Sequence, residues 1–127
     1  MKLNHDCVRD TLLYLESNLE LNKSITLSTI SIPKHSLEDI TYTVQKLAEA
    51  EFLNIKLFCY DNEYNCFISS ISYKGHEYLD NIRDDGIWKE TKKILSKFTS
   101  VSLSFTATVA AEVLSNVILA SMGIPKI

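Results

Sequence analysis

The stretch Ile68-Ser-Ser-Ile-Ser-Tyr-Lys-Gly-His-Glu-Tyr-Leu-Asp-Asn-Ile82 decides the fold, because a strand pattern passes directly into a helical one. Phe67, Ser69 and Ile71 alternate with the residues between them, which is the period of a strand. A helix is predicted from Tyr73 to about Ile82, opening on Tyr-Lys-Gly. This arrangement indicates a fold and a binding module rather than a reaction.

Upstream of this stretch the sequence predicts a β-hairpin. Apolar residues alternate at Leu53, Ile55, Leu57 and Cys59, and a polar segment at 61–64 separates them from the next strand. A two-residue loop at Asn62 and Glu63 would place Cys59 opposite Cys66.

Helical periodicity predicts the remaining elements. A first helix is expected from about Asn4, a good N-cap, to Leu19. Residues 24–32 (SITLSTISI) favour a strand. Ser36, followed by Asp39, resembles a capping box and starts a helix to about Glu51 with a buried stripe of Ile40, Val44, Leu47 and Ala48. After a break at 84–86, two more helices are expected at about 87–98 and 101–122.

The strand that runs into YKGHEYL is similar to the way many winged helix-turn-helix domains leave their wing. Together with residues 1–10 (MKLNHDCVRD), 42–52 (YTVQKLAEAEF) and 67–88, it makes residues 1 to 105 resemble domain-of-unknown-function family 2513. That family consists of small proteins of bacteria, phages and other mobile elements. The resemblance implies a winged-helix-like fold and a mobile-element setting, and it carries over no catalytic or binding residues.

We therefore expect an α+β protein: a winged helix-turn-helix-like domain at 1–83 with a two-stranded wing, and two additional C-terminal helices at 84–127. The sequence departs from a typical helix-turn-helix at 24–32, where the second helix is very short or replaced by extended chain. The length of 127 residues and a 46% hydrophobic content suit one core plus an appendage.

Composition also bounds the setting. The first helix carries charges at Asp6, Arg9 and Asp10, which is unlike a signal peptide, so a cytoplasmic location is expected. The odd set of three cysteines has no CxxC spacing, which predicts reduced thiols and neither a metal site nor a cofactor. Residues 1–87 hold 8 Lys and Arg against 14 Asp and Glu, whereas residues 88–127 hold 5 against 2. Nucleic-acid binders usually concentrate basic charge in the domain that contacts the phosphates.

The helix at 36–51 occupies the place of a recognition helix. Its predicted solvent face has a net charge of −2 and consists of Glu38, Asp39, Tyr42, Gln45, Lys46 and Glu49. Carboxylates in the first turn stabilise a helix through its dipole, and in a few DNA-binding proteins they accept a hydrogen bond from cytosine. The candidate phosphate contacts are Lys34, His35, Lys46 and Lys56, with Tyr64 at the wing.

The C-terminal helices offer two further candidate surfaces. A basic stripe of Lys89, Lys92, Lys93 and Lys97 is compatible with a solvated face, contact to nucleic acid or an acidic protein, or the rim of an oligomer. The last helix has Glu112 as its one charge between 101 and 124. That charge at a bilayer centre would cost about 2.5 kcal/mol or more, so we expect no membrane span. We expect instead a homo-oligomer, or packing on the domain itself, through Phe105, Val109, Val113, Asn116 and Ala120.

Two functional hypotheses remain, and neither is an enzyme. The histidines are scattered, and the sequence lacks a nucleophile elbow, a phosphate loop, HExxH and paired carboxylates. The preferred hypothesis is a DNA-binding transcriptional regulator, with double-stranded DNA as partner and a dimer that sets half-site spacing. The alternative is a protein-binding module whose acidic face inhibits a host defence nuclease, as an anti-CRISPR protein does. The fold favours the first hypothesis and the acidic helix favours the second.

Overall fold

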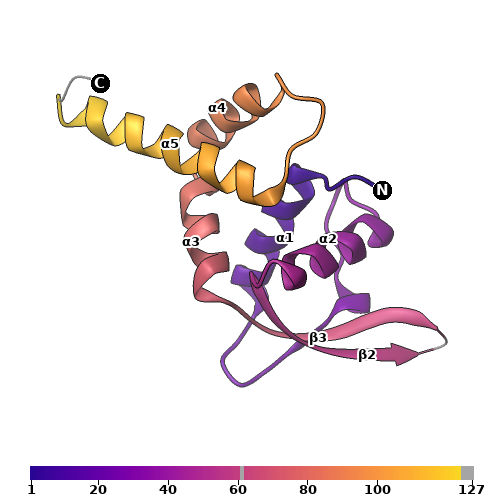
Figure 1. Cartoon of the computed structure of the whole chain (residues 1–127). Coiled ribbons are helices and arrows are strands. Elements are labelled where there is room, and N and C mark those ends of the chain that lie inside the picture. Colours follow the sequence, from indigo (N-terminus) through magenta and orange to yellow (C-terminus); the bar gives the residue numbers. More distant parts are fainter. Residues whose placement is uncertain (61, 124–127) are drawn as a thin grey trace. The chain divides into compact units, whose positions relative to one another are not determined.

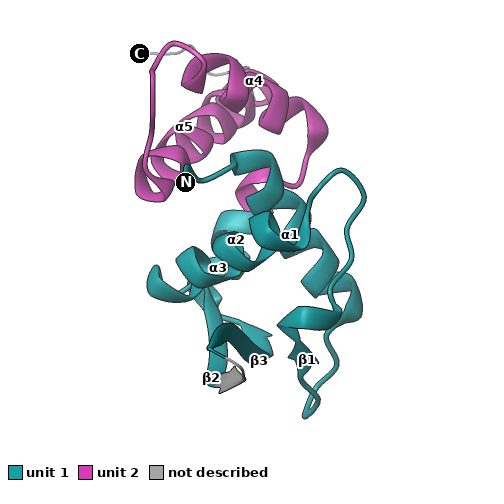
Figure 2. Cartoon of the chain, turned by 90° about the vertical axis from the view of Figure 1, so that its right-hand side faces the viewer, with its two compact units in different colours: residues 1–79 teal, residues 80–127 magenta. Residues whose placement is uncertain are grey.

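The computed structural model describes residues 1–60 and 62–123 and divides the chain into two compact units, residues 1–79 and 80–127 (Figure 2). The described residues form a mixed α+β structure with five α-helices and a three-stranded antiparallel sheet. The elements of the first unit are α1 (His5–Asn18), β1 (Ile25–Thr26), the 3₁₀ turn η1 (Leu27–Thr29), α2 (Leu37–Glu49), β2 (Leu53–Tyr60), β3 (Glu63–Ile71) and most of α3 (Tyr73–Ile82) (Figure 1).

The sheet has the order β1-β3-β2, so the prediction of two strands was one strand short. Ile25 pairs with Ile68 and Thr26 with Phe67, which places β1 along the edge of β3 that β2 leaves open. The strand that the sequence predicts for 24–32 is limited to these two residues.

The chain turns after Thr26 because hydroxyl and amide side chains satisfy the backbone locally. The Thr29 hydroxyl donates to the Thr26 carbonyl at 2.7 Å, which favours the 3₁₀ turn. Asn65 of β3 then binds Ser28 twice: its side-chain oxygen accepts from the Ser28 N–H at 3.3 Å, and its amide donates to the Ser28 hydroxyl at 3.2 Å. A strand through 32 would have to give up these contacts.

The β2–β3 hairpin forms as predicted, but with a different register. Cys66 pairs with Leu57 and Cys59 with Tyr64, so the expected pairing of Cys59 with Cys66 is wrong. Tyr60 pairs with Glu63, and the turn between them contains Asn62 at φ 62°, a left-handed conformation that asparagine tolerates. The preference of Asn for this position moves the loop toward the N-terminus by one residue.

Helices α1 and α2 supply most of the core of the first unit. Both predicted N-caps are confirmed: the Asn4 side chain accepts from the Cys7 N–H at 3.1 Å, and the Ser36 hydroxyl accepts from the Asp39 N–H at 3.1 Å. The side chains that these helices and the sheet bury completely include Val8, Leu12, Leu15, Ile40, Val44, Leu47 and Ile68.

The start of α3 is fastened to the corner between α2 and β2. The Ser72 hydroxyl donates to the Glu51 carbonyl at 2.6 Å and accepts from the Gly75 N–H at 3.0 Å. The Ser72 N–H donates to the Phe52 carbonyl, also at 3.0 Å. Gly75 is required by this approach, because a Cβ there would lie 2.2 Å from the Phe52 carbonyl oxygen. The glycine in YKGHEYL is thus explained by packing.

The described elements of the second unit are the end of α3, α4 (Asp85–Leu95) and α5 (Leu103–Ser121). The break predicted at 84–86 is shorter, because the Asp84 side chain caps α4 by accepting from the Ile87 N–H at 2.9 Å. Ser102 caps α5 in the same way. The two helices pack through a shared cluster of Ile87, Leu95, Val109 and Val113.

Candidate functional site

The solvent face of α2 gathers the predicted binding residues and is acidic at its N-terminal end. Glu38 and Asp39 are exposed in the first turn, Tyr42 and Gln45 are half-buried, and Glu49 is exposed near the last turn. The positive end of the helix dipole stabilises carboxylates in this position. They would repel a phosphate that approached the same end.

Lys46 interacts with residues of its own helix. Its Nζ lies 2.9 Å from a Glu49 carboxylate oxygen and 5.4 Å from the centre of the Tyr42 ring. The hydrogen bond to Glu49, together with the charge of that carboxylate, raises the pKa of Lys46. A phosphate would therefore have to compete with an existing anion for this ammonium.

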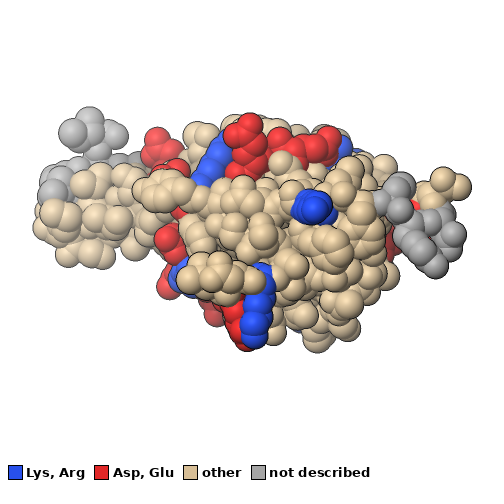
Figure 3. Space-filling model, turned by 90° about the horizontal axis from the view of Figure 1, so that it is seen from below, with Lys and Arg blue, Asp and Glu red and all other residues tan. Residues whose placement is uncertain are grey.

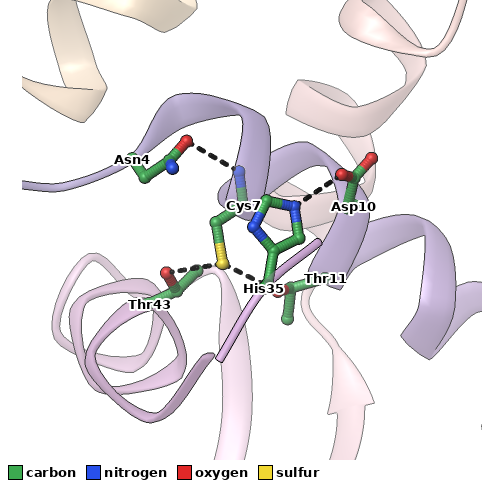
Figure 4. Close-up of polar contacts among 6 residues, drawn as sticks. All are labelled: Asn4, Cys7, Asp10, Thr11, His35 and Thr43. Carbon is green, nitrogen blue, oxygen red and sulfur yellow. Dashed lines mark hydrogen bonds and ion pairs between the residues drawn. The ribbon is translucent and has the colours of Figure 1, made fainter. Parts of the chain in front are cut away.

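His35 serves the fold, which corrects its assignment as a phosphate contact. Its Nε2 lies 2.7 Å from Asp10 Oδ2 of α1, and its side chain is only 7% exposed (Figure 4). The pair fastens the segment before α2 to α1. Sequence periodicity could not indicate this contact, because 25 positions separate the partners.

Cys7 lies in the same region, so the residue types Cys, His and Asp occur close together (Figure 4). The Cys7 sulfur accepts from the Thr43 hydroxyl at 3.3 Å and lies 3.9 Å from the Thr11 hydroxyl. Cys7 is fully buried, whereas reactive thiols sit in accessible, electropositive surroundings. This cluster therefore packs α1 against α2, and it offers a substrate no access to the sulfur.

A hollow of about 460 Å³ opens between η1, the first half of α2 and the start of β3. Its size falls in the range of about 300–1,000 Å³ that is common for ligand sites. It brings together four predicted residues, Glu38, Tyr42, Gln45 and Tyr64, with others that the sequence did not indicate: Met1, Leu27, Ser28, Leu37, Thr41, Glu63 and Asn65.

The lining of this hollow is apolar and aromatic, with carboxylates. Leu37 is 48% exposed although it opens a helix whose other leucine is buried. Burial raises the pKa of Tyr64, and the neighbouring Cys66 and Glu49 add to the rise. None of the described lining residues is Lys or Arg, and Glu38 and Glu63 are the carboxylates among them.

All four predicted basic phosphate contacts lie outside this lining, and two of them, unlike His35 and Lys46, have no partner described above. Lys34 and Lys56 are exposed, the first before α2 and the second on β2 opposite Phe67. On the face seen from below in Figure 1, Lys and Arg are scattered among Asp, Glu and uncharged residues and do not form a patch (Figure 3).

In the second unit the basic stripe is solvent-exposed, whereas the predicted oligomer seam is interrupted. Lys89, Lys92, Lys93 and Lys97 are all exposed, and Lys92 Nζ lies 5.9 Å from the centre of the Trp88 ring.

Val109 and Val113 are buried against α4, so these two seam residues are not available to a second copy. Phe105 is 39% exposed, beside Phe98, Asn116 is half-buried and Ala120 is exposed. The exposed apolar residues of the distal part of α5 are instead Val117, Ile118 and Met122. By length and composition α5 could cross a membrane, but the core helix of a soluble protein can pass the same test.

Comparisons with known proteins give a family. The model of the family described as "Hypothetical protein (DUF2513)" matches residues 2–102. A protein of Haemophilus influenzae, named "Uncharacterized protein", is 30% identical over 119 residues, which cover 93% of this chain and 99% of that protein. No solved structure gives a significant match.

Proposed function

This chain belongs to the DUF2513 family, and we propose that it is a noncatalytic binding protein with a winged helix-turn-helix fold that binds a basic protein. The order α1, β1, η1, α2, β2, β3 and the sheet order β1-β3-β2 support the fold. In this assignment α2 takes the place of the recognition helix, the β2–β3 hairpin is the wing, and η1 stands where a full second helix is usual.

The residues that line the hollow between α2 and β3 are the observation that favours a basic protein over DNA as the partner. In a winged helix this is the surface that meets the ligand, and here it presents Glu38 and Glu63 with apolar and aromatic side chains. DNA affinity depends on neutralising phosphates with Lys and Arg. The two nearest predicted contacts, His35 and Lys46, are held by Asp10 and Glu49. A partner with positive charge suits this surface better than a polyanion.

A basic protein partner fits the alternative role that the sequence suggests, inhibition of a host defence nuclease in a phage or mobile-element setting. Such nucleases carry basic nucleic-acid channels, which an acidic face of this kind would complement.

DNA-binding regulation is the second candidate, favoured by two observations. The proposed winged order of elements is one, and the exposed basic stripe of α4 and the turn that follows it is the other. Because Lys89, Lys92, Lys93 and Lys97 lie outside the α2 face, this candidate places the phosphate contacts on the second unit.

Fluorescence anisotropy with two labelled probes tests the choice: a 30-base-pair duplex and an octa-arginine peptide, each at about 50 and 150 mM salt. We expect the peptide to bind and the duplex to bind weakly or not at all. The double change Glu38→Gln with Asp39→Asn should weaken peptide binding, because it removes two exposed carboxylates.

Duplex binding that persists at 150 mM salt would contradict the proposal and support the DNA-binding candidate. In that case the same double change should tighten nonspecific binding and steepen its salt dependence. Glu77→Gln on the exposed side of α3 is the matched control, because it removes one carboxylate outside the α2 face.

A further inference from the structure

The geometry points to the hollow between α2 and β3 as the site for a short peptide segment of the partner that carries an aromatic or long aliphatic anchor next to an arginine. This inference rests on the proposed function and adds the location and the chemistry of the contact. It concerns the hollow alone, so the rest of the α2 face could bind a basic protein without it.

The apolar half of the hollow selects the anchor. The apolar and aromatic lining residues come from three separate elements and converge on one space: Leu27 from η1, Leu37 and Tyr42 from α2, and Tyr64 from β3. An exposed leucine beside two tyrosine rings gains when an apolar group covers it, at roughly 25 cal/mol per Å². Interface anchors are enriched in aromatic residues because they fill pockets of this size and kind.

The charged rim selects the cation. Glu38 is exposed at the mouth of the hollow, and the structure records no ion pair for it among the described residues. Tyr64 offers a ring face, and a guanidinium both stacks on aromatic rings and binds carboxylates through two N–H groups. Lys46 already lies over the Tyr42 ring, which leaves Tyr64 as the ring for an incoming arginine.

Polar groups among the lining residues suit a peptide backbone. Ser28 and Asn65 hold each other through two hydrogen bonds and so keep η1 and β3 at a fixed spacing. The Tyr42 hydroxyl donates to the Met1 carbonyl at 3.4 Å, and this hydrogen bond holds Met1 along one side of the hollow. Thr41 and Gln45, one helical turn apart on α2, can donate to and accept from an extended segment.

Titration of isotope-labelled full-length protein followed by NMR tests the site with three capped hexapeptides of equal length, centred on Trp-Arg, Trp-Glu or Ala-Arg. At about 2 mM the Trp-Arg peptide should shift resonances of Leu37, Thr41 and Tyr64, and the other two should bind at least about threefold more weakly. Glu38→Gln should lower the affinity for Trp-Arg about threefold and remove the preference over Trp-Glu.

Thr41→Trp fills the hollow from the half-buried face of α2 and should abolish the shifts at Leu37 and Tyr64. Glu77→Gln should leave them unchanged. Equal affinity for all three peptides, or shifts that survive Thr41→Trp, would overturn the inference.

The same variants separate the two proposals. If octa-arginine still binds, and still responds to the Glu38 and Asp39 changes, while the Trp-Arg peptide shifts nothing in the hollow, the inference fails and the proposed function stands. If octa-arginine does not bind at all, the proposed function fails, and the inference that rests on it fails as well.

Discussion

Replacing Gly75 with alanine should destabilise the protein, although the same change inside a helix usually stabilises it. Alanine gains about 1 kcal/mol over glycine in helix propensity. Against this, the new Cβ would lie 2.2 Å from the Phe52 carbonyl oxygen and 2.7 Å from the Ile71 side chain. Moving apart by about 1 Å costs roughly 1–3 kcal/mol in a packed interior. The displaced carbonyl also accepts the Ser72 N–H, which adds about 1 kcal/mol if that bond weakens.

The net expectation is a loss of about 2 kcal/mol, or a midpoint of thermal unfolding about 8 °C lower. Urea and thermal unfolding followed by far-ultraviolet circular dichroism measure both quantities. Gly86→Ala is the matched control: it also lies in a helix, and its Cβ would meet only the Asp84 carboxylate, at 3.1 Å. A Gly75→Ala protein as stable as the wild type would refute the close approach of α3 to Phe52.

Three further predictions concern buried and exposed side chains. Tyr78 is 3% exposed and its hydroxyl lacks a partner among the described residues, so Tyr78→Phe should raise the free energy of unfolding by about 1 kcal/mol, measured in urea; a loss would mean that the hydroxyl is bonded. Burial raises the pKa of the Cys66 thiol from 9.0 to about 11, so on raising the pH the unfolded chain loses this proton before the folded protein does. The free energy of unfolding should therefore fall between about pH 9 and pH 11. The fall should be smaller in Cys66→Ala, and an identical fall in the variant would contradict the assignment. If the chain self-associates through the exposed part of α5, Val117→Lys with Ile118→Lys should give a monomer with unchanged helix content by light scattering and circular dichroism, whereas the same mass before and after would exclude this surface.

Local rules predicted the helices and the hairpin because the residues that define them lie close together in the chain. Asn4 and Ser36 cap their helices as expected, since a cap needs only the next three residues. The same rules failed at 24–32. There the outcome depends on Asn65, whose hydrogen bonds to Ser28 favour a turn over the strand that β-branched residues suggest.

The candidate site was predicted in part for the same reason. Projection of α2 placed Glu38, Tyr42 and Gln45 on one face correctly, but it could not show that Leu27 and Asn65 complete a hollow beside them. The sequence analysis also counted His35 and Lys46 as available cations. The Asp10 partner of His35 is 25 positions away and could not be seen in the sequence, whereas the Lys46–Glu49 pair has the i, i+3 spacing of helix neighbours and could have been noticed. Val109 and Val113 show a second limit of the sequence pattern. Apolar spacing predicts that these residues make a contact, but it does not tell a contact within the chain from one between chains, and here the contact is with α4.

The two-residue strand β1 has a kinetic consequence. Pairing β1 with Ile68 and Phe67 closes a long loop, which costs chain entropy, and only two residue pairs offset that cost. The β2–β3 hairpin has more pairs and closes a short loop. Local contacts form first during folding, so β1 and η1 should dock last and open first. Amide hydrogens of residues 25–29 should then exchange with solvent faster than those of β2. Each opening would expose the unpaired backbone N–H and C=O groups of β3 at Phe67 and Ile68, and an extended strand from another chain could pair with them.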